Sequence, residues 1–335
     1  MSESPAISVI MPVYNGRAFI ARSLPPLIDM VGRSELVEVI VVDDTSTDDT
    51  AALAVQMGAR VMPSGGRLGP GGARNMAAAQ ARGDILWFVD ADVVVHGDAA
   101  RELRRAFAEP DVTAAFGSYD DQPAAKNFLS QYKNLVHHFY HHRGHREAST
   151  FWAGCGGVRK DAFLALGGFD VMQYTRPSIE DIELGYRLRA AGGRIVLWPA
   201  LQGTHLKVWR FFNLIHTEIF CRAIPWSRLM LSRTGMVNDL NVGTGERMRA
   251  VVAGLFFASV VASLHPAVPG WVALAALGAI ALANGRLLRL FYRRKGALFA
   301  LGGLLFHQFY YLYSSAAFAW CWLERAVTGP APPRT

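Results

Sequence analysis

Two aspartates separated by a single residue follow an apolar run in the first third of the chain. The run from Ile85 to Val89 has the length and composition of a buried strand, and Asp90 and Asp92 come directly after it. In an open α/β sheet, ligands bind just beyond the carboxyl ends of the strands. Two carboxylates there can hold a divalent cation, which in turn can hold phosphates. A solvated polar turn is the alternative, and the pair alone does not decide between the two.

The elements that would position this pair alternate between strands and helices. Short apolar runs predict strands at residues 7–11, 37–42, 59–62 and 85–89, and helical spacing and capping residues predict helices at 17–30, 50–57 and 73–81. Residues 65–72 are glycine-rich and are expected to form a flexible loop. This alternation predicts a parallel, doubly wound sheet. Three of its strand ends carry polar clusters, which would meet at one edge: Asn15, Asp43 with Asp44, and Asp90 with Asp92.

The composition restricts the class of protein. The chain has 335 residues, of which 51% are hydrophobic and only 18% charged, and its formal net charge is +7. Its pI of about 9.5 indicates polyanionic partners, such as anionic lipid or phosphorylated substrates. The first half has no long Lys/Arg run, which makes nucleic acid the weakest candidate. Three distant cysteines indicate neither a disulfide framework nor a metal site. The N-terminus lacks signal-peptide features, so we expect the first domain to stay in the cytoplasm.

Six segments of the first two-thirds of the chain carry a resemblance to a known family. In order, they span residues 8–15, 41–48, 72–75, 88–92, 154–170 and 180–188. Their order and spacing resemble the motifs of family 2 glycosyltransferases with the GT-A fold, and most of all those of bacterial, membrane-attached members. The resemblance covers about residues 6–210. The expected fold class is therefore α/β, a doubly wound GT-A (nucleotide-diphospho-sugar transferase) sheet followed by C-terminal transmembrane helices.

The resemblance implies a nucleoside-diphosphate sugar as the donor substrate. Asp44 or its neighbour Asp43, together with Arg74, would face the base, and Asp90 would lie near the ribose. A carboxylate suits this place because it accepts a hydrogen bond from a ring N–H. Further residues expected to contact the donor are Pro12, Tyr14, Asn75, Lys207 and Trp209.

The resemblance also implies a metal site and a catalytic base. Asp92 would be the main ligand of Mg²⁺ or Mn²⁺, with Asp90 and, less specifically, His205 as further ligands. Asp181 would act as the general base that takes the proton of the acceptor hydroxyl, and direct displacement would invert the anomeric configuration. Its neighbour Glu180 could bind the acceptor instead. Helix capping alone would also explain two acids at a helix start.

One departure from the family bears on the type of product. Processive relatives carry a Gln-x-x-Arg-Trp motif near this point, and the segment from Gly203 to Arg210 lacks it. Lys207, Trp209 and Arg210 are a loose substitute that could contact the diphosphate. The departure argues against a polymerase and for the transfer of single sugars.

Five histidines between residues 137 and 145 form a second unusual cluster. His137 and His141, like His138 and His142, are four residues apart, a spacing that can bind Zn²⁺ on a helix. Because the segment has no carboxylate or cysteine to complete such a site, we favour a basic, aromatic helix near the acceptor or the membrane surface.

The last third of the chain has the composition of a membrane region. Residues 250–285 and 297–323 contain no Asp, Glu, Lys or Arg, and a basic segment at 286–295 separates them. With a break at residues 265–270, this pattern predicts about three transmembrane helices in the inner membrane, with the basic segment and the catalytic domain on the cytoplasmic side. The predicted organisation is a catalytic domain at 1–206, an amphipathic interfacial segment at 207–248, a transmembrane region at 249–325 and a disordered tail at 326–335.

These expectations combine into a membrane-anchored, metal-dependent, inverting glycosyltransferase. Its acceptor would be a membrane lipid or a lipid-linked glycan, reached at the cytoplasmic leaflet. Two alternatives are a non-catalytic nucleotide-sugar-binding membrane scaffold and a nucleotidyltransferase of related fold, which would release pyrophosphate from nucleoside triphosphates. The sequence names neither the sugar, nor the base, nor the acceptor.

Overall fold

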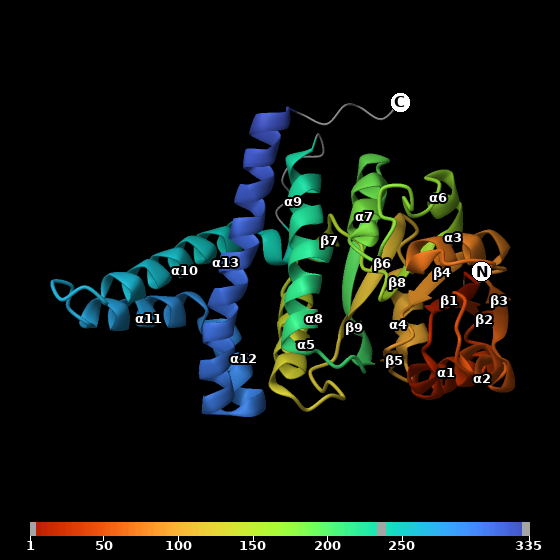
Figure 1. The fold of residues 1–335 in the computed structure, drawn as a ribbon. Coiled ribbons are helices and arrows are strands. Elements are labelled where there is room, and N and C mark those ends of the chain that lie inside the picture. Colours follow the sequence, from red (N-terminus) through yellow and green to blue (C-terminus); the bar gives the residue numbers. More distant parts are fainter. Residues whose placement is uncertain (1–4, 233–238, 330–335) are drawn as a thin grey trace. The chain divides into compact units, whose positions relative to one another are not determined.

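The structure is a computed structural model that describes residues 5–232 and 239–329. The chain divides into two compact units (Figure 1). The first, residues 1–208, is built around a β-sheet and is called the sheet unit below. The second, residues 209–335, is described through its helices and is called the helical unit.

The sheet unit contains a nine-stranded sheet with the order β3-β2-β1-β4-β8-β6-β9-β5, and β7 pairs with β9. Strands β1 to β4 are parallel to one another where they pair, as predicted. The rest of the sheet is mixed, because β8 runs antiparallel between β4 and β6, and β5 runs antiparallel to β9. The strands are β1 (Ile7–Val13), β2 (Glu38–Asp43), β3 (Arg60–Pro63), β4 (Ile85–Val89), β5 (Val93–Val95), β6 (Val112–Tyr119), β7 (Glu147–Ala148), β8 (Cys155–Arg159) and β9 (Arg194–His205).

The three helices predicted in this unit are present, and the predicted loop at residues 65–72 is corrected. The helices of the unit are α1 (Arg17–Gly32), α2 (Thr50–Gln56), α3 (Gly69–Gln80), α4 (Ala99–Ala106), α5 (Phe128–His141), α6 (Lys160–Ala165) and α7 (Glu180–Ala190). Part of the expected flexible loop is helical, since α3 begins at Gly69 and not at Ala73. Pro70 occupies its first turn, where the missing N–H costs nothing.

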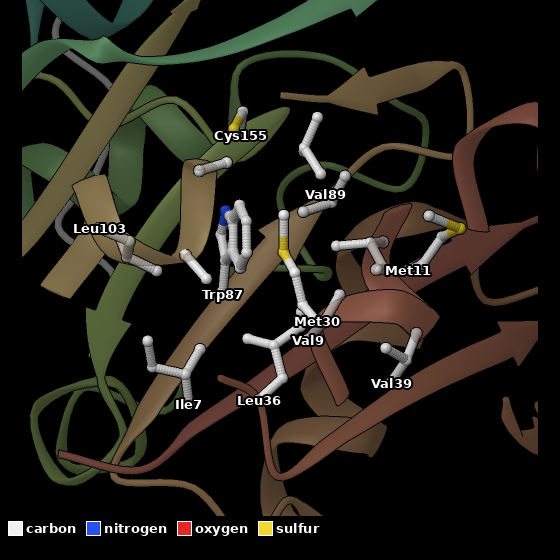
Figure 2. Packing of buried hydrophobic residues seen from close by; sticks show 14 of the residues in the cluster. Ile7, Val9, Met11, Met30, Leu36, Val39, Trp87, Val89, Leu103 and Cys155 are labelled. Atoms are coloured by element: carbon white, nitrogen blue, oxygen red, sulfur yellow. The ribbon is translucent and has the colours of Figure 1, made fainter. Parts of the chain in front are cut away.

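The hydrophobic core explains why the strands appear in the sequence as continuous apolar runs. Val9, Met11 and Trp87 share one packed cluster with Met30 of α1 and Leu103 of α4 (Figure 2). The opposite face of β4 is also covered, because the ring of Phe88 lies 5.3 Å from those of both Phe163 and Phe169. A strand buried on both faces has no polar face to alternate with.

The described part of the helical unit begins with short helical segments and continues with longer helices. They are α8 (Phe211–His216), the π-helix η1 (Thr217–Ala223), α9 (Ile224–Leu231), the 3₁₀ turn η2 (Leu240–Val242), α10 (Thr244–Ala262), α11 (Trp271–Ala283), α12 (Gly285–Lys295) and α13 (Ala297–Thr328). Helices α10 and α11 lie side by side, as do α12 and α13 (Figure 1). Residues 233–238 of the predicted interfacial segment lie outside the described residues.

The described helices bear on the expected membrane region. Taken singly, none of them combines the length and the hydropathy needed to cross a bilayer, and only α11 with α12, bent by 82° at their junction, meets both requirements as a pair. Asn284 lies at this bend, where it donates to the carbonyl of Ile280 (2.9 Å) and accepts from the hydroxyl of Tyr311 (3.3 Å). The three predicted spans remain a prediction.

The predicted disordered tail is partly wrong. Helix α13 continues to Thr328, so residues 326–328 belong to a helix. Residues 330–335 lie outside the described part of the chain.

The histidine cluster lies on and just after α5, and two of its members remain neutral. Burial and hydrogen bonding distinguish His141, whose Nδ1 lies 2.7 Å from the carbonyl oxygen of Gly117. Burial lowers the pKa of His141 to about 4, and burial and the neighbouring His138 lower the pKa of His142 to about 4. Throughout residues 5–232 and 239–329, no group of three or more His, Cys, Asp or Glu side chains is arranged to hold a metal ion. The structure therefore gives no support to a zinc site on α5.

We expect His141 to make the fold sensitive to acid. An unfolded histidine titrates near pH 6.5, whereas folded His141 stays neutral to about pH 4, so the unfolded state binds more protons between these values. The free energy of unfolding should therefore fall as the pH is lowered through this window, by up to about 3 kcal/mol.

Urea unfolding of the full chain at several pH values between 7 and 4.5 measures this effect. His141→Asn keeps an N–H donor for the Gly117 carbonyl but does not titrate, so its stability should depend less on pH. His145→Asn, at an exposed histidine beyond the helix, is the matched control. An unchanged slope in His141→Asn would contradict the prediction.

Candidate functional site

The two aspartates after β4 do not share a partner. Asp90 accepts a hydrogen bond from the Nη2 of Arg74 at 2.5 Å. The Oδ2 of Asp92 lies 3.6 Å from the Nε2 of His205, the last residue of β9. The chain turns between the two aspartates, since the N–H of Val93 bonds back to the carbonyl of Asp90 at 2.9 Å. This turn directs one carboxylate toward α3 and the other toward β9.

Arg74 is a buried cation on α3, with only 4% of its surface exposed. Besides Asp90, its guanidinium lies over the rings of Phe88 (5.9 Å) and Phe169 (5.6 Å). Among the described residues its Nε has no hydrogen-bond partner. A buried N–H without a partner is costly, and a ligand oxygen would satisfy it.

The electrostatics of the two aspartates differ. Burial raises the pKa of Asp90, as do the neighbouring carboxylates of Asp92 and Asp181, while Arg74 opposes this rise. Burial also disfavours the charged form of Asp92, but the neighbouring His205 ring and Lys207 together lower its pKa below the usual value. Asp92 is therefore the more strongly anionic member of the pair.

Helix α7 presents Glu180 and Asp181 in its first turn. The Oδ2 of Asp181 accepts the N–H of Ala153 at 3.1 Å, and the carbonyl of the next residue, Gly154, accepts the N–H of Asp90 at 3.1 Å. One short stretch of main chain thus holds Asp181 and the start of the Asp90 turn together.

A close backbone contact places α7 beside this stretch. A Cβ at Gly185 would lie 2.5 Å from the backbone nitrogen of Phe151, so α7 can approach only because this position is glycine. The helix that carries Asp181 therefore packs directly on the main chain of residues 150–151.

Glu180 has a different environment from Asp181. It is buried, and its Oε2 accepts the N–H of Ser178 at 2.8 Å. Burial, followed by repulsion from Asp181, raises the pKa of Glu180, and Arg74 opposes the rise. Glu180 thus helps to hold the turn before α7, in addition to any role toward an acceptor.

The loops after β1 and β2 are tied together at the neighbouring strand ends. The carbonyl oxygen of the Asn15 side chain accepts the N–H of Thr47 at 2.7 Å, and the N–H of Asn15 donates to the hydroxyl of Ser46 at 2.9 Å. Asn15 and Thr45 have φ values of 47° and 65°, in the left-handed region. Backbone strain of this kind is common where a site is pre-organised.

Asp43 and Asp44, which the sequence does not distinguish, have separate environments. Both oxygens of Asp44 are used within the chain: they accept the N–H groups of Leu68 (2.8 Å) and Gly69 (2.9 Å). Asp43 accepts the N–H of Ser46 through Oδ2 (3.3 Å), whereas its Oδ1 is buried and has no hydrogen-bond partner in the part of the chain that the structure describes. Asp43 is therefore the better candidate to accept a ring N–H.

The remaining residues predicted to contact the donor fall into three groups. Tyr14 is half-exposed at the end of β1, directly after the Pro12–Val13 pair, and Arg67 lies over its ring at 3.3 Å. The side chain of Asn75 makes two hydrogen bonds of 2.8 Å with the backbone of Phe169, so it supports the fold. Lys207 lies in the sheet unit near Asp92, whereas Trp209 is the first residue of the helical unit.

Tyr119 and Trp152 also belong to the site, and neither is among the residues predicted from the sequence. Tyr119 ends β6, and its ring stacks on that of His205 at 4.2 Å with an interplanar angle of 11°. Trp152 precedes Ala153 and meets Tyr119 edge to face at 4.8 Å. A signal for Tyr119 existed, since Asp120 and Asp121 follow it and mark another polar strand end.

Residues 8–167 match the family model described as Glycosyl transferase family 2. That segment is similar to the domains of this family. It contains the first four of the motifs that carry the resemblance and ends before the Glu180–Asp181 pair.

Two relatives of this chain come from bacteria. The probable glycosyltransferase YdaM of Bacillus subtilis is 26% identical over 227 residues, which cover 60% of this chain and 50% of the relative. The uncharacterized protein MT1568 of Mycobacterium tuberculosis is 38% identical over 115 residues, which cover 33% of this chain and 35% of the relative. The chain thus spans half or less of the length of these curated relatives.

A solved structure shares the fold. The mannosyltransferase PcManGT of Pyrobaculum calidifontis, solved with GDP-Man and Mn²⁺, aligns with a TM-score of 0.53 and 18% identity over 95% of this chain and 88% of its own. The mixed α/β sheet and this similarity support the GT-A fold.

We expect Asp43 and Asp44 to respond differently to substitution. Asp44→Asn would leave one carboxamide oxygen for two N–H groups, so it should lower the stability by about 1–3 kcal/mol. Asp43→Asn would weaken the acceptor offered to a base, and it should reduce nucleotide affinity by about tenfold or more, the effect of one hydrogen bond to a charged group.

Thermal unfolding and calorimetric titration with UDP and with GDP measure the two effects, and each variant is the control for the other. The assignment is wrong if Asp43→Asn binds both nucleotides as the unmodified chain does, or if Asp44→Asn loses affinity without losing stability.

Proposed function

We propose that this chain is an inverting glycosyltransferase that transfers a single sugar from a nucleoside-diphosphate sugar to a lipid or lipid-linked acceptor at the cytoplasmic face of the inner membrane. The observation that carries the proposal is the shared main-chain segment at Ala153 and Gly154, which holds Asp181 and Asp90 in one site. The match to family 2 and the relatives named as glycosyltransferases support it. GDP-Man in the solved PcManGT structure supports a nucleotide-sugar donor.

The donor set at Asp92 fits a divalent cation. Its carboxylate is anionic and partly exposed, and it lies beside one imidazole nitrogen of His205. A protein that offers one or two ligands leaves room for diphosphate oxygens and water in the coordination shell. An imidazole ligand favours Mn²⁺ over Mg²⁺, which prefers oxygen. When bound, the cation would stabilise the negative charge on the leaving diphosphate.

The residues of the chain would perform the remaining steps. Asp181 would accept the proton of the acceptor hydroxyl as that oxygen attacks the anomeric carbon. The bond between the anomeric carbon and the diphosphate would break on the opposite face, so the configuration inverts. Arg74, with its unpaired Nε–H, would hold a donor oxygen near Asp90. Asp43 would accept a base N–H.

Replacing the proposed base should abolish transfer but not donor binding. We expect Asp181→Asn to lower the turnover number by about 10²–10⁴-fold, the usual contribution of general base catalysis, with little change in nucleotide affinity. Release of nucleoside diphosphate from a panel of UDP- and GDP-sugars, with Mn²⁺ and bacterial lipid extract present, measures the effect.

Asp161→Asn is the matched control, because Asp161 also lies in the first turn of a helix and bonds the following N–H as Asp181 does (2.7 and 2.9 Å). If no donor in the panel is consumed, the chain is not such a transferase. Pyrophosphate release from nucleoside triphosphates would point to a nucleotidyltransferase instead.

The helical unit supports the membrane part of the proposal. Large apolar side chains on α10 and α11 are exposed, among them Val261 (66%), Trp271 (66%) and Leu282 (85%). Exposed apolar surface on this scale marks an interaction site. On α12, Arg286, Arg289 and Arg293 are exposed at positions i, i+3 and i+7, so they share one face, which suits anionic headgroups.

Neutralising this basic face should weaken binding to anionic vesicles. The full chain is diluted out of detergent into phosphatidylcholine vesicles with or without phosphatidylglycerol, and the fraction that floats with them is measured. Substitution of Arg286, Arg289 and Arg293 by Gln should remove up to about 1 kcal/mol of binding per arginine, and only with phosphatidylglycerol present.

Substitution of Arg22, Arg101 and Arg189 by Gln removes the same charge from exposed positions of the sheet unit and should have no such effect. Protein that floats with neither vesicle type would overturn the membrane proposal.

A further inference from the structure

Four aromatic rings form a continuous stack that ends beside Asp92. The ring of His205 stacks on Tyr119 (4.2 Å, 11°), Tyr119 meets His137 at a tilt (4.3 Å, 37°), and His137 stacks on His141 (3.8 Å, 27°). We call these four residues the ring column. His141 closes it, because its Nδ1 lies 2.7 Å from the carbonyl oxygen of Gly117 on β6.

The geometry of the sheet explains the first contact of the ring column. Strands β6 and β9 are parallel neighbours, and Tyr119 lies opposite Gly203. His205 is two residues further along β9, so the two rings form a diagonal pair on one face, within the reach of aromatic side chains. Both residues are buried, Tyr119 at 8% exposure and His205 at 6%.

Trp152 supports the ring column from the side. Its ring lies 4.8 Å from Tyr119, 4.6 Å from His137 and 5.3 Å from His141, at steep angles to all three. A Cβ at Gly154 would lie 2.6 Å from the Trp152 ring, so the indole can occupy this position only because residue 154 is glycine.

The ring column acts on the site through the orientation of one imidazole. The Nε2 of His205 faces Asp92 across 3.6 Å, longer than a hydrogen bond, so this contact alone fixes the ring weakly. The terminal torsion of a histidine has broad minima, and a flat neighbour at stacking distance restricts it. Groups that orient a metal-binding histidine are a general determinant of metal affinity.

We propose that Tyr119 is a positioning residue, which holds the His205 imidazole so that its Nε2 and the Asp92 carboxylate meet at one cation. The rest of the ring column and Trp152 hold Tyr119 in place. This assignment rests on the proposed function, since it requires a cation at Asp92. In this arrangement His137 and His141 of α5 support the site without binding a metal themselves.

The test compares Mn²⁺ affinity, measured by electron paramagnetic resonance of the free ion, with and without UDP or GDP. Tyr119→Leu removes the flat ring and should weaken Mn²⁺ binding by about tenfold, the usual lower range for such supporting groups. Tyr119→Phe keeps the ring and should stay within about twofold of the unmodified chain, because the stack does not involve the hydroxyl.

Two further variants separate positioning from a general loss of packing. Tyr132→Leu changes another buried tyrosine, on α5, which has no place in the ring column. It should lower the melting temperature and leave Mn²⁺ affinity unchanged. In a His205→Ala background, which should itself bind Mn²⁺ more weakly, Tyr119→Leu should have no further effect on Mn²⁺ binding.

The outcomes distinguish this inference from the proposed function. Unchanged Mn²⁺ affinity in Tyr119→Leu, or an equal loss with and without His205, overturns the positioning role while the transferase proposal stands. Full Mn²⁺ affinity in His205→Ala also overturns it. If the unmodified chain binds no Mn²⁺ with either nucleotide, both the inference and the metal part of the proposed function are wrong.

Discussion

The pairing of Arg74 with Asp90 is the interaction on which the rest of the site depends. The carboxylates of Asp90, Asp92, Glu180 and Asp181 lie near the end of β4, where burial and, after it, repulsion from neighbouring carboxylates raise the pKa values of Asp90 and Glu180. Arg74 opposes both rises. Because a guanidinium cannot lose its proton, this compensation persists at any physiological pH.

Asp92 has other neighbours than Asp90, and its pKa shifts in the opposite direction. His205 and Lys207 lower the pKa of Asp92, while Asp90 is bonded to Arg74. Two aspartates separated by one residue thus differ in charge and partner, because the intervening turn directs them to different elements. An Asp-x-Asp sequence is therefore not by itself a pair of equivalent ligands.

The parts of the fold that the sequence predicts are those where local pattern and tertiary packing agree. Strands β1, β2 and β4 are buried on both faces, so apolar runs identify them. The start of α3 at Gly69 was not predictable from propensity, because glycine disfavours helices and a distant carboxylate, Asp44, holds the first turn. The antiparallel β8 contains two glycines and depends on pairing with strands far away in sequence.

The same distinction applies to the candidate site. Motif resemblance identified Asp90, Asp92 and Asp181, but it could not separate Asp43 from Asp44, because the difference depends on which backbone N–H groups reach each carboxylate. Tyr119 and His205 stack because β6 and β9 pair in parallel. This pairing joins segments that are far apart in the sequence, so no local pattern predicts the contact.

The contact at Gly185 has a consequence for how this site can change. At Gly185, helix α7 rests directly on main chain, so at this point its position is set by atoms that every sequence shares. Substitutions elsewhere in the interior can then accumulate with little displacement of Asp181. Such an arrangement uncouples the position of this carboxylate from the surrounding loops, which are then free to vary in sequence.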